Sequence, residues 1–177
     1  MKIVAEKIVY KARFFEVKEQ EVALPNDKKH VYQSVERRPT VGIFPLTGTH
    51  NLYLISQYRV MFGKRILEAI GGHVNKDETS LAAAKRELRE EVGMRASQWE
   101  EIARIEKSAS VIRETFHLFL AYDLEKGKPN PDAGEDIQLV KLPLKEAVAR
   151  VMSGEINNAA TMIGILLLDN LKRNKKL

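Results

Sequence analysis

Three glutamates lie at a spacing that could bind a metal ion. Glu87 precedes Glu90 by three residues and Glu91 by four. Side chains at these spacings share one edge of an α-helix, where like charges disfavour the helix by about 0.2–0.5 kcal/mol per pair. Arg86 can pair with Glu90 but cannot neutralise the whole group. Carboxylates without Cys or His on that edge suit a hard, oxygen-seeking cation such as Mg²⁺ or Mn²⁺.

The glutamates need a helix to hold them, and the flanking residues predict one. Asp77 or Thr79 can cap its start, and Gly93 stands where a left-handed residue ends a helix. Between them the apolar residues recur at helical spacing, at Leu81, Ala84, Leu88 and Val92. Just upstream, Gly71-Gly72 allows a backbone carbonyl to come close to the same cations.

Residues 72–94 match a known motif at every specified position. The stretch contains Gly72, five residues, Glu78, seven residues, and then Arg86-Glu87-Leu88-Arg89-Glu90-Glu91-Val92-Gly93-Met94. It resembles the box of the Nudix hydrolases. A bare Glu-Leu-Arg-Glu-Glu run would more often be a solvated, salt-bridged helix, but the register with the flanking residues argues against that alternative. The resemblance implies hydrolysis of a nucleoside diphosphate linked to another moiety, with divalent cations, Mg²⁺ or Mn²⁺.

Length and composition predict a soluble globular protein with a hydrophobic core. The chain has 177 residues, 44% hydrophobic and 30% charged, which suits one domain, or one domain with a small appendage. It has no cysteine, which excludes disulfides and thiolate metal sites. No apolar leader segment is visible, and the longest apolar run, residues 162–168, is far too short for a membrane span. We therefore expect a cytoplasmic protein without a membrane partner.

The net charge of +5 could indicate a nucleic-acid partner. Part of the excess lies in the C-terminal residues 172–176, however, and no nucleic-acid-binding module is present. A solvated basic end, together with a mild field that attracts an anionic small substrate, is the favoured interpretation. Nucleic acid is not the expected partner.

Strand patterns lie on both sides of the predicted helix. Strands are expected within residues 1–36 (at 6–18, 22–24 and 29–35), then at 98–107, 115–122 and 137–141. Residues 40–46 and 51–58 predict a hairpin around Gly48-Thr49-His50. Residues 127–134 form a turn-rich loop, and helices are expected at 144–152 and 159–171.

This order of elements predicts an α/β or α+β fold. The family resemblance implies an α/β/α sandwich over residues 39–177, preceded by a small antiparallel β subdomain over residues 1–38. Such a subdomain is typical of the branch that hydrolyses ADP-ribose and nucleoside diphosphate sugars. There it mediates a homodimer and can be exchanged between the subunits.

Segments outside the box also resemble this branch, so the resemblance covers nearly the whole chain. They are Glu36-Arg37-Arg38-Pro39, Gln57-Tyr58-Arg59, Leu67-Glu68-Ala69-Ile70-Gly71 and Gly134-Glu135-Asp136. The resemblance implies metal binding by Gly71, Glu87, Glu90, Glu91 and Glu135. It implies catalytic roles for Glu135, Glu90, Glu91 and Arg86, with Glu135 as the preferred base for activating water. It implies substrate binding by Arg37, Arg59, Glu68 and Glu114.

One segment departs from the pattern of the ADP-ribose branch. Where that branch usually carries Ser-Pro-Gly followed four residues later by Glu, this chain has Ser108-Ala109-Ser110 and then Glu114. The change removes a fixed φ and a permissive residue, so the loop can adopt a different path. The preferred sugar therefore stays open.

The predicted reaction is hydrolysis of the pyrophosphate of ADP-ribose or a related nucleoside diphosphate sugar, giving a nucleoside monophosphate and a sugar phosphate. The first alternative is a hydrolase that prefers GDP-mannose or accepts many nucleotide sugars. More distant alternatives are an RNA 5′ pyrophosphohydrolase and a Nudix ligand sensor that binds without cleaving.

Overall fold

The computed structural model describes residues 1–25, 28–108, 110–131, 134 and 136–177. The chain forms two compact units. Unit 1 comprises Met1–Pro39 and Ile105–Phe116, and unit 2 comprises Thr40–Arg104 and His117–Leu177. The small N-terminal unit therefore also contains a second segment, residues 105–116, from the middle of the chain.

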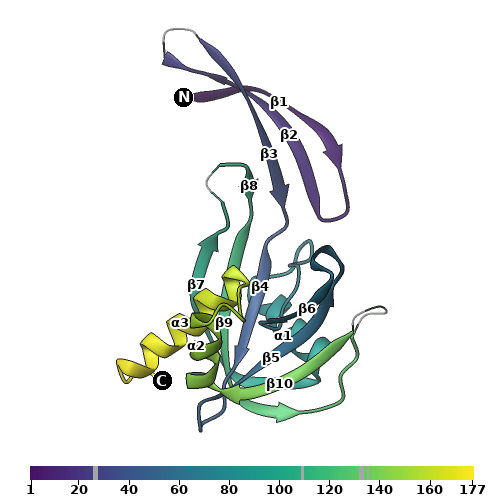
Figure 1. Cartoon of the computed structure of the whole chain (residues 1–177). Coiled ribbons are helices and arrows are strands. Elements are labelled where there is room, and N and C mark those ends of the chain that lie inside the picture. The colour runs from purple at the N-terminus through teal and green to yellow at the C-terminus, as the bar shows by residue number, and fades with distance from the viewer. Residues whose placement is uncertain (26–27, 109, 132–133, 135) are drawn as a thin grey trace. The chain divides into compact units, whose positions relative to one another are not determined.

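Unit 1 is a four-stranded sheet (Figure 1). Its strands β1 (Lys2–Lys11), β2 (Phe15–Ala23), β3 (Lys29–Arg37) and β8 (Ile112–Arg113) lie in that order. The first three are antiparallel, and β8 pairs with β3 in parallel. The prediction of one strand over residues 6–18 was wrong. The chain reverses after β1, where the Ala12 amide donates to the Phe15 carbonyl at 2.9 Å, and this turn carries neither Gly nor Pro.

The sheet of unit 1 has almost no core of its own. Every residue of β1 is exposed, and Val22 is the single buried hydrophobic side chain among the described residues of this unit. Lys–Glu pairs cross the strands, for example Lys7 with Glu19 at 2.5 Å. Exposed ion pairs contribute little stability. The backbone ladder therefore supplies most of the order that unit 1 has by itself.

Unit 2 contains two three-stranded sheets. One has the order β4 (Thr40–Pro45), β9 (Thr115–Lys126), β7 (Met94–Glu106), and the other has β10 (Ile137–Pro143), β5 (Asn51–Arg59), β6 (Lys64–Glu68). The prediction that residues 40–46 and 51–58 pair as a hairpin was wrong, because the two strands form no continuous ladder of hydrogen bonds. Strands β4 and β5 belong to different sheets and share a single bridge, Leu46 with Leu52. Strand β4 is buried along its whole length and pairs with the distant β9 instead.

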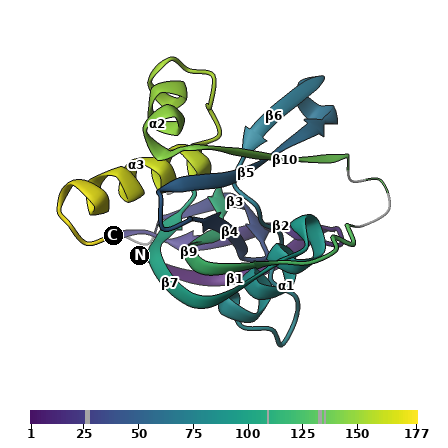
Figure 2. The same ribbon diagram turned by 90° about the horizontal axis from the view of Figure 1, so that it is seen from below.

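Helices cover both faces of the strands. Helix α1 (Ser80–Val92) lies on one side, and α2 (Leu144–Met152) and α3 (Ala159–Arg173) lie on the other, with β4 and β9 between them (Figure 2). Successive strand residues point to opposite faces. Accordingly Ile43 joins the cluster around Leu88 of α1, while the ring of Phe44 packs against Gly164 of α3. The predicted α/β/α sandwich is thereby confirmed.

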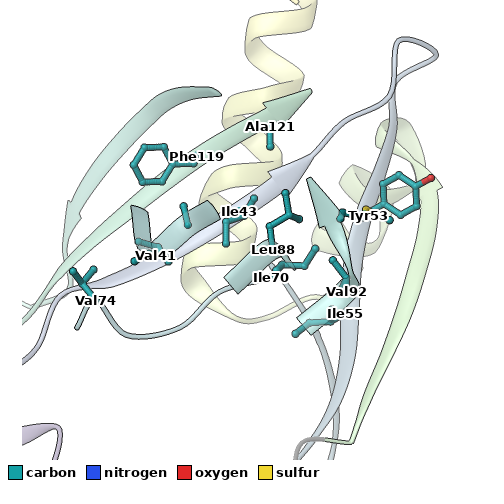
Figure 3. Packing of buried hydrophobic residues seen from close by; sticks show 13 residues of the cluster. Val41, Ile43, Tyr53, Ile55, Ile70, Val74, Leu88, Val92, Phe119 and Ala121 are labelled. Atoms are coloured by element: carbon teal, nitrogen blue, oxygen red, sulfur yellow. The ribbon is translucent and has the colours of Figure 1, made fainter. Parts of the chain in front are cut away.

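The cluster beside α1 is the main core of unit 2 (Figure 3). It combines Val41 and Ile43 of β4, Phe119 of β9 and Leu88 of α1, all of them at most 3% exposed. Residues Ile70 and Val74, on either side of Gly71-Gly72, belong to the same cluster. The core therefore fixes the glycine pair directly against the helix that carries the three glutamates.

Local signals define the two ends of α1. Of the two predicted capping residues, Thr79 caps the helix, because its hydroxyl accepts from the Ala82 amide at 3.1 Å. Gly93 ends it with φ at 68°, in the left-handed region that glycine adopts without strain. No helix in the described ranges has the length and apolar character to cross a bilayer.

Candidate active site

The edge of α1 presents its glutamates in three different environments. Glu91 is buried, at 6% exposure, and accepts from the Gly71 amide at 3.1 Å. The carboxylate of Glu87 lies so close to Gly72 that a β-carbon there would overlap it. Glu90 is the most open of the three, with its side chain 34% exposed. The Gly71-Gly72 pair is therefore in direct contact with two of the three carboxylates.

Arg86 joins these residues into one network. Its Nε and Nη2 each donate to a different oxygen of Glu78 at 3.0 Å, and Nη2 also donates to the His73 carbonyl at 3.0 Å. Its Nη1 donates to Glu87 at 2.7 Å and to Glu90 at 3.2 Å. The guanidinium thus ties the loop before the helix to two glutamates of the helix edge.

The electrostatics of this network favour its charged forms. The hydrogen bonds from Arg86 lower the pKa of the Glu78 carboxyl, against the opposing effect of burial. Glu78 in turn raises the pKa of the Arg86 guanidinium, with smaller contributions from Glu87 and Glu90. Glu78 also accepts from the Asn75 amide at 3.0 Å, so the turn at the start of the box is held by the same carboxylate.

The carboxylate oxygens of the box are chemically suited to bind a divalent cation. Three carboxylates, those of Glu78, Glu87 and Glu90, contact the Arg86 guanidinium, and the carboxylate of Glu91 lies on the same helix edge against Gly71, so the group carries negative charge that a cation would compensate. All are oxygen donors, as hard cations prefer. Within the part of the chain that is described, no three acidic or histidine side chains converge into a ready-made ligand group. Glu87 and Glu90 are instead turned toward Arg86.

A second arginine lies in unit 2 at the end of β5. Arg59 donates from Nε to the Glu68 carboxylate at 2.6 Å. Glu68 on β6 is buried, with 9% of its side chain exposed, whereas the Arg59 side chain is 42% exposed. The antiparallel pairing of β5 and β6 brings the two residues together. The buried carboxylate therefore holds the Nε atom of a partly exposed arginine.

The segment that leads from β6 to the box is anchored by α3. Thr161 is 1% exposed, and its hydroxyl accepts from the Ala69 amide at 2.9 Å. The Asn158 side chain caps α3 and binds both the amide and the hydroxyl of Thr161 at 3.1 Å. The C-terminal helix thus positions the backbone two residues before Gly71.

In unit 1, Arg37 and Glu114 form an ion pair with Nη1 and Oε2 3.1 Å apart. Lys107 joins the same carboxylate oxygen at 3.2 Å. Glu114 is 2% exposed. Two of the predicted substrate-binding residues therefore contact each other, and a third residue joins them that sequence analysis had not identified.

Glu135, the predicted base, lies outside the described residues. Its neighbour Asp136 forms an ion pair with Arg65 of β6, whose Nη2 also donates to the Asp136 carbonyl at 3.0 Å. On the other side of this connection, the Asn130 amide donates to the Glu90 carbonyl at 2.8 Å. The chain around the acidic loop is thus tied to α1 and to β6.

Known proteins resemble this chain in sequence. The family model described as NUDIX domain matches residues 36–160. The chain belongs to the Nudix family. An ADP-ribose pyrophosphatase of Mycobacterium tuberculosis is 29% identical over 166 residues, covering 92% of this chain and 80% of that protein. A GDP-mannose pyrophosphatase of Cronobacter sakazakii is 29% identical over 131 residues, covering 69% and 66%.

A solved structure supports the fold of this Nudix protein. The crystal structure of an ADP compounds hydrolase matches with a TM-score of 0.83 at 23% identity, over 99% of this chain and 96% of that one. Together with the box and the relatives, this identifies a Nudix pyrophosphohydrolase that resembles the ADP-ribose pyrophosphatase branch. Nudix hydrolases generally use a divalent metal ion.

Sequence analysis of this Nudix chain missed Lys107 and Arg65. Lys107 meets Glu114 only because its amide donates to the Glu114 carbonyl at 3.1 Å, across the end of the β7–β9 pair. Arg65 meets Asp136 across 71 residues of sequence. A weak signal existed for Lys107, since it directly precedes the altered Ser108-Ala109-Ser110 run.

Proposed function

We propose that this chain hydrolyses the pyrophosphate of ADP-ribose or a related nucleoside diphosphate sugar, with Mg²⁺, to a nucleoside monophosphate and a sugar phosphate. The observation that carries the proposal is the edge of α1, where Glu87 and Glu91 lie against Gly72 and Gly71 and Arg86 links them to the loop. The matching ADP-ribose pyrophosphatase supports the choice of substrate class.

The box residues have distinct proposed roles. Glu87, Glu90, Glu91 and the Gly71 carbonyl would hold the metal. When bound, the cation supplies charge compensation for the pyrophosphate and acidifies the attacking water. Arg86 keeps the carboxylates in register through its hydrogen bonds to the loop and the helix.

Proton transfer completes the proposed mechanism. Glu135, or otherwise Glu90 or Glu91, takes the proton from water as its oxygen bonds to one phosphorus. The bond between that phosphorus and the bridging oxygen breaks, and the bridging oxygen leaves with the other phosphate. Glu90 suits proton transfer with solvent better than Glu91, because its side chain is 34% exposed whereas Glu91 is buried.

Arg59 is the proposed phosphate-binding residue of unit 2. In the described structure its Nε is engaged by Glu68, so the two terminal nitrogens can donate to phosphate oxygens. Arginine suits this task because its planar fork matches phosphate oxygens in pairs. Glu68 then acts by orienting Arg59, since the carboxylate itself is buried.

A hydrolase that prefers GDP-mannose or accepts many nucleotide sugars is the second candidate. Two observations favour it: the altered run at residues 108–110 and the similarity to a GDP-mannose pyrophosphatase. An RNA 5′ pyrophosphohydrolase and a non-catalytic sensor have less support. The two relatives compared above are named as an ADP-ribose pyrophosphatase and a GDP-mannose pyrophosphatase, and the full set of box carboxylates favours catalysis over binding alone.

A product assay decides among these candidates. The protein is incubated with Mg²⁺ and, separately, ADP-ribose, GDP-mannose, ADP-glucose, NADH, a dinucleoside polyphosphate and a 5′-triphosphate RNA. The proposal expects nucleoside monophosphate from ADP-ribose or another nucleotide sugar, and none after chelation of the metal. Turnover of the RNA alone, or of no substrate at all, would overturn it.

We also propose that unit 1 mediates a homodimer, either by face-to-face packing or by exchange of the unit. The exposed apolar side chains of its sheet support this, since an unpaired apolar surface favours burial against a partner. They include Ile8 at 50% and Tyr32 at 43% exposure, which the strand register places on one face, opposite Lys18 and Gln20 of β2. Light scattering should give a dimer mass for the wild type and a monomer mass for Ile8→Lys/Tyr32→Lys. A monomeric wild type would refute this proposal.

A further inference from the structure

Three residues of unit 1 meet around one buried carboxylate. Arg37 ends β3, Lys107 follows β7 and Glu114 precedes β9. The Oε2 atom of Glu114 lies 3.1 Å from Arg37 Nη1 and 3.2 Å from Lys107 Nζ. The backbone hydrogen bond from the Lys107 amide to the Glu114 carbonyl fixes the two residues opposite each other.

Burial separates the acid from the bases. The Glu114 side chain is 1% exposed, whereas the side chains of Arg37 and Lys107 are 32% and 46% exposed. A carboxylate taken out of water needs cationic partners. Two cations of the described structure pair with it, so these three side chains together carry a net charge of +1. That charge is carried by the two side chains that reach solvent.

The backbone around this group is held in place. The hydroxyl of Ser108 accepts from the Ser110 amide at 3.3 Å and from the Val111 amide at 3.5 Å. Val111 in turn accepts from the Val35 amide of β3 at 2.8 Å, just before β8 pairs with the same strand. Lys107 itself is held by its amide, which donates to the Glu114 carbonyl at 3.1 Å, and by its ammonium, which lies 3.2 Å from Glu114 Oε2. Because the ion pair already orders the lysine side chain, little side-chain entropy is lost when an anion binds.

We infer that Arg37 and Lys107 form a two-cation phosphate site in unit 1 and that Glu114 positions them instead of contacting the sugar. The inference rests on the proposed function, which supplies the ligand: a phosphate of the nucleoside diphosphate. Arginine offers a planar fork and lysine a compact charge, which together suit a phosphate group. Lys107 is the new substrate-binding residue, and it stands at the beginning of the run that departs from the ADP-ribose branch.

The competing explanation is a purely structural role, a staple in which the three residues only join β3 to the segment 105–116 within unit 1. A staple and a phosphate site differ in what Lys107→Met does. Loss of a staple lowers the melting temperature and leaves ligand affinity unchanged. Loss of a phosphate ligand weakens binding of any compound that carries the diphosphate.

The probe is ADP, which keeps the diphosphate and lacks the distal sugar of ADP-ribose, and its binding is measured by titration calorimetry without metal. Lys107→Met should weaken ADP binding about tenfold, the effect of losing one charge-assisted hydrogen bond. Lys107→Arg should stay within about threefold of the wild type because it keeps the charge. Lys145→Met, at an exposed lysine of α2, is the matched control and should not change it. Equal ADP affinity of Lys107→Met and wild type, or no ADP binding by the wild type, overturns the inference.

Glu114→Gln tests the positioning role. It should change the affinities for ADP and for ADP-ribose by the same factor, because the diphosphate is common to both. A loss confined to ADP-ribose would show a direct sugar contact and contradict the assignment. Failure of the proposed function shows separately, as a wild type that binds ADP but hydrolyses no nucleotide sugar with Mg²⁺. If Glu114→Gln does not fold, the Lys107 variants still decide the inference.

Discussion

Replacing Arg86 with alanine should destabilise unit 2 because it removes the residue that links the box loop to α1. The side chain is 23% exposed and donates hydrogen bonds to three carboxylates and one carbonyl. Removing one partner of a buried ion pair costs about 3–5 kcal/mol, and partial exposure to solvent reduces this. We expect Arg86→Ala to lower the free energy of unfolding by about 2–3 kcal/mol, mostly from Glu78 and Glu87.

The neighbouring Arg89 provides a matched control on the same helix. Its side chain is 55% exposed and makes one long ion pair, 3.3 Å to Glu90. Arg89→Ala should therefore change the free energy of unfolding by about 0.5 kcal/mol or less. Both variants are unfolded in urea and followed by circular dichroism, with the slope compared to the wild type to check that the transition is the same.

The same unfolding experiment is repeated in the presence of Mg²⁺. Arg86→Ala leaves three carboxylates, those of Glu78, Glu87 and Glu90, without this guanidinium, so Mg²⁺ should raise its stability more than that of the wild type. Equal losses for Arg86→Ala and Arg89→Ala would refute the role of Arg86 as the link between loop and helix. Equal Mg²⁺ effects on wild type and Arg86→Ala would refute the charge argument.

Three further predictions concern catalysis, binding and pH. Glu87→Gln and Glu91→Gln should each lower kcat by at least about 100-fold with unchanged far-UV circular dichroism, and near-full activity in both would disprove the metal assignment. Arg59→Lys should raise KM about tenfold with little change in kcat, because lysine cannot reproduce the fork that Glu68 orients; an unchanged KM would show that Arg59 does not bind phosphate. Arg104, and to a smaller extent His117, lower the pKa of Glu101 to about 2, so its stabilisation is complete above pH 4.5 and is lost as pH falls toward 2. Urea unfolding of wild type and Glu101→Gln should therefore differ at pH 6 and converge near pH 2, and a pH-independent difference would contradict this.

The sequence predicted the box helix well because its signals are local. Periodicity, the Thr79 cap and the left-handed Gly93 are all encoded within residues 79–93, and the structure places the helix at Ser80–Val92. The two C-terminal helices were equally predictable from their apolar spacing. What a helix buries is largely decided by residues three and four apart.

Strand partners were harder to predict because they are not local. Residues 40–46 and 51–58 alternate as hairpin strands do, yet β4 pairs with β9, some 75 residues later, and β5 pairs with β10. Strand β6, after the exposed Val60, Met61 and Phe62, gave no clear pattern. Strand β8 also gave no clear pattern, because it has two residues and is defined by its pairing with β3.

The site residues show the same contrast between local and non-local signals. The box carboxylates were identified from spacing alone, whereas the ion pairs that orient Arg37 and Arg59 depend on strands meeting in space. Lys107 and Arg65 were missed for that reason: their carboxylate partners lie across a strand pair or a long connection. Burial of Glu114 was also not visible in the sequence, since it lies between Arg113 and Thr115, whereas the apolar neighbours Leu67 and Ala69 of Glu68 did indicate a buried position.

The most direct test of the central claim is mass-spectrometric identification of the products of ADP-ribose with Mg²⁺, for the wild type and Glu91→Gln side by side. We expect AMP and ribose 5-phosphate in equal amounts from the wild type, and a rate lower by at least about 100-fold from the folded variant. Release of AMP at the same rate by both proteins, or cleavage of ADP-ribose at any bond other than the pyrophosphate, would contradict the account.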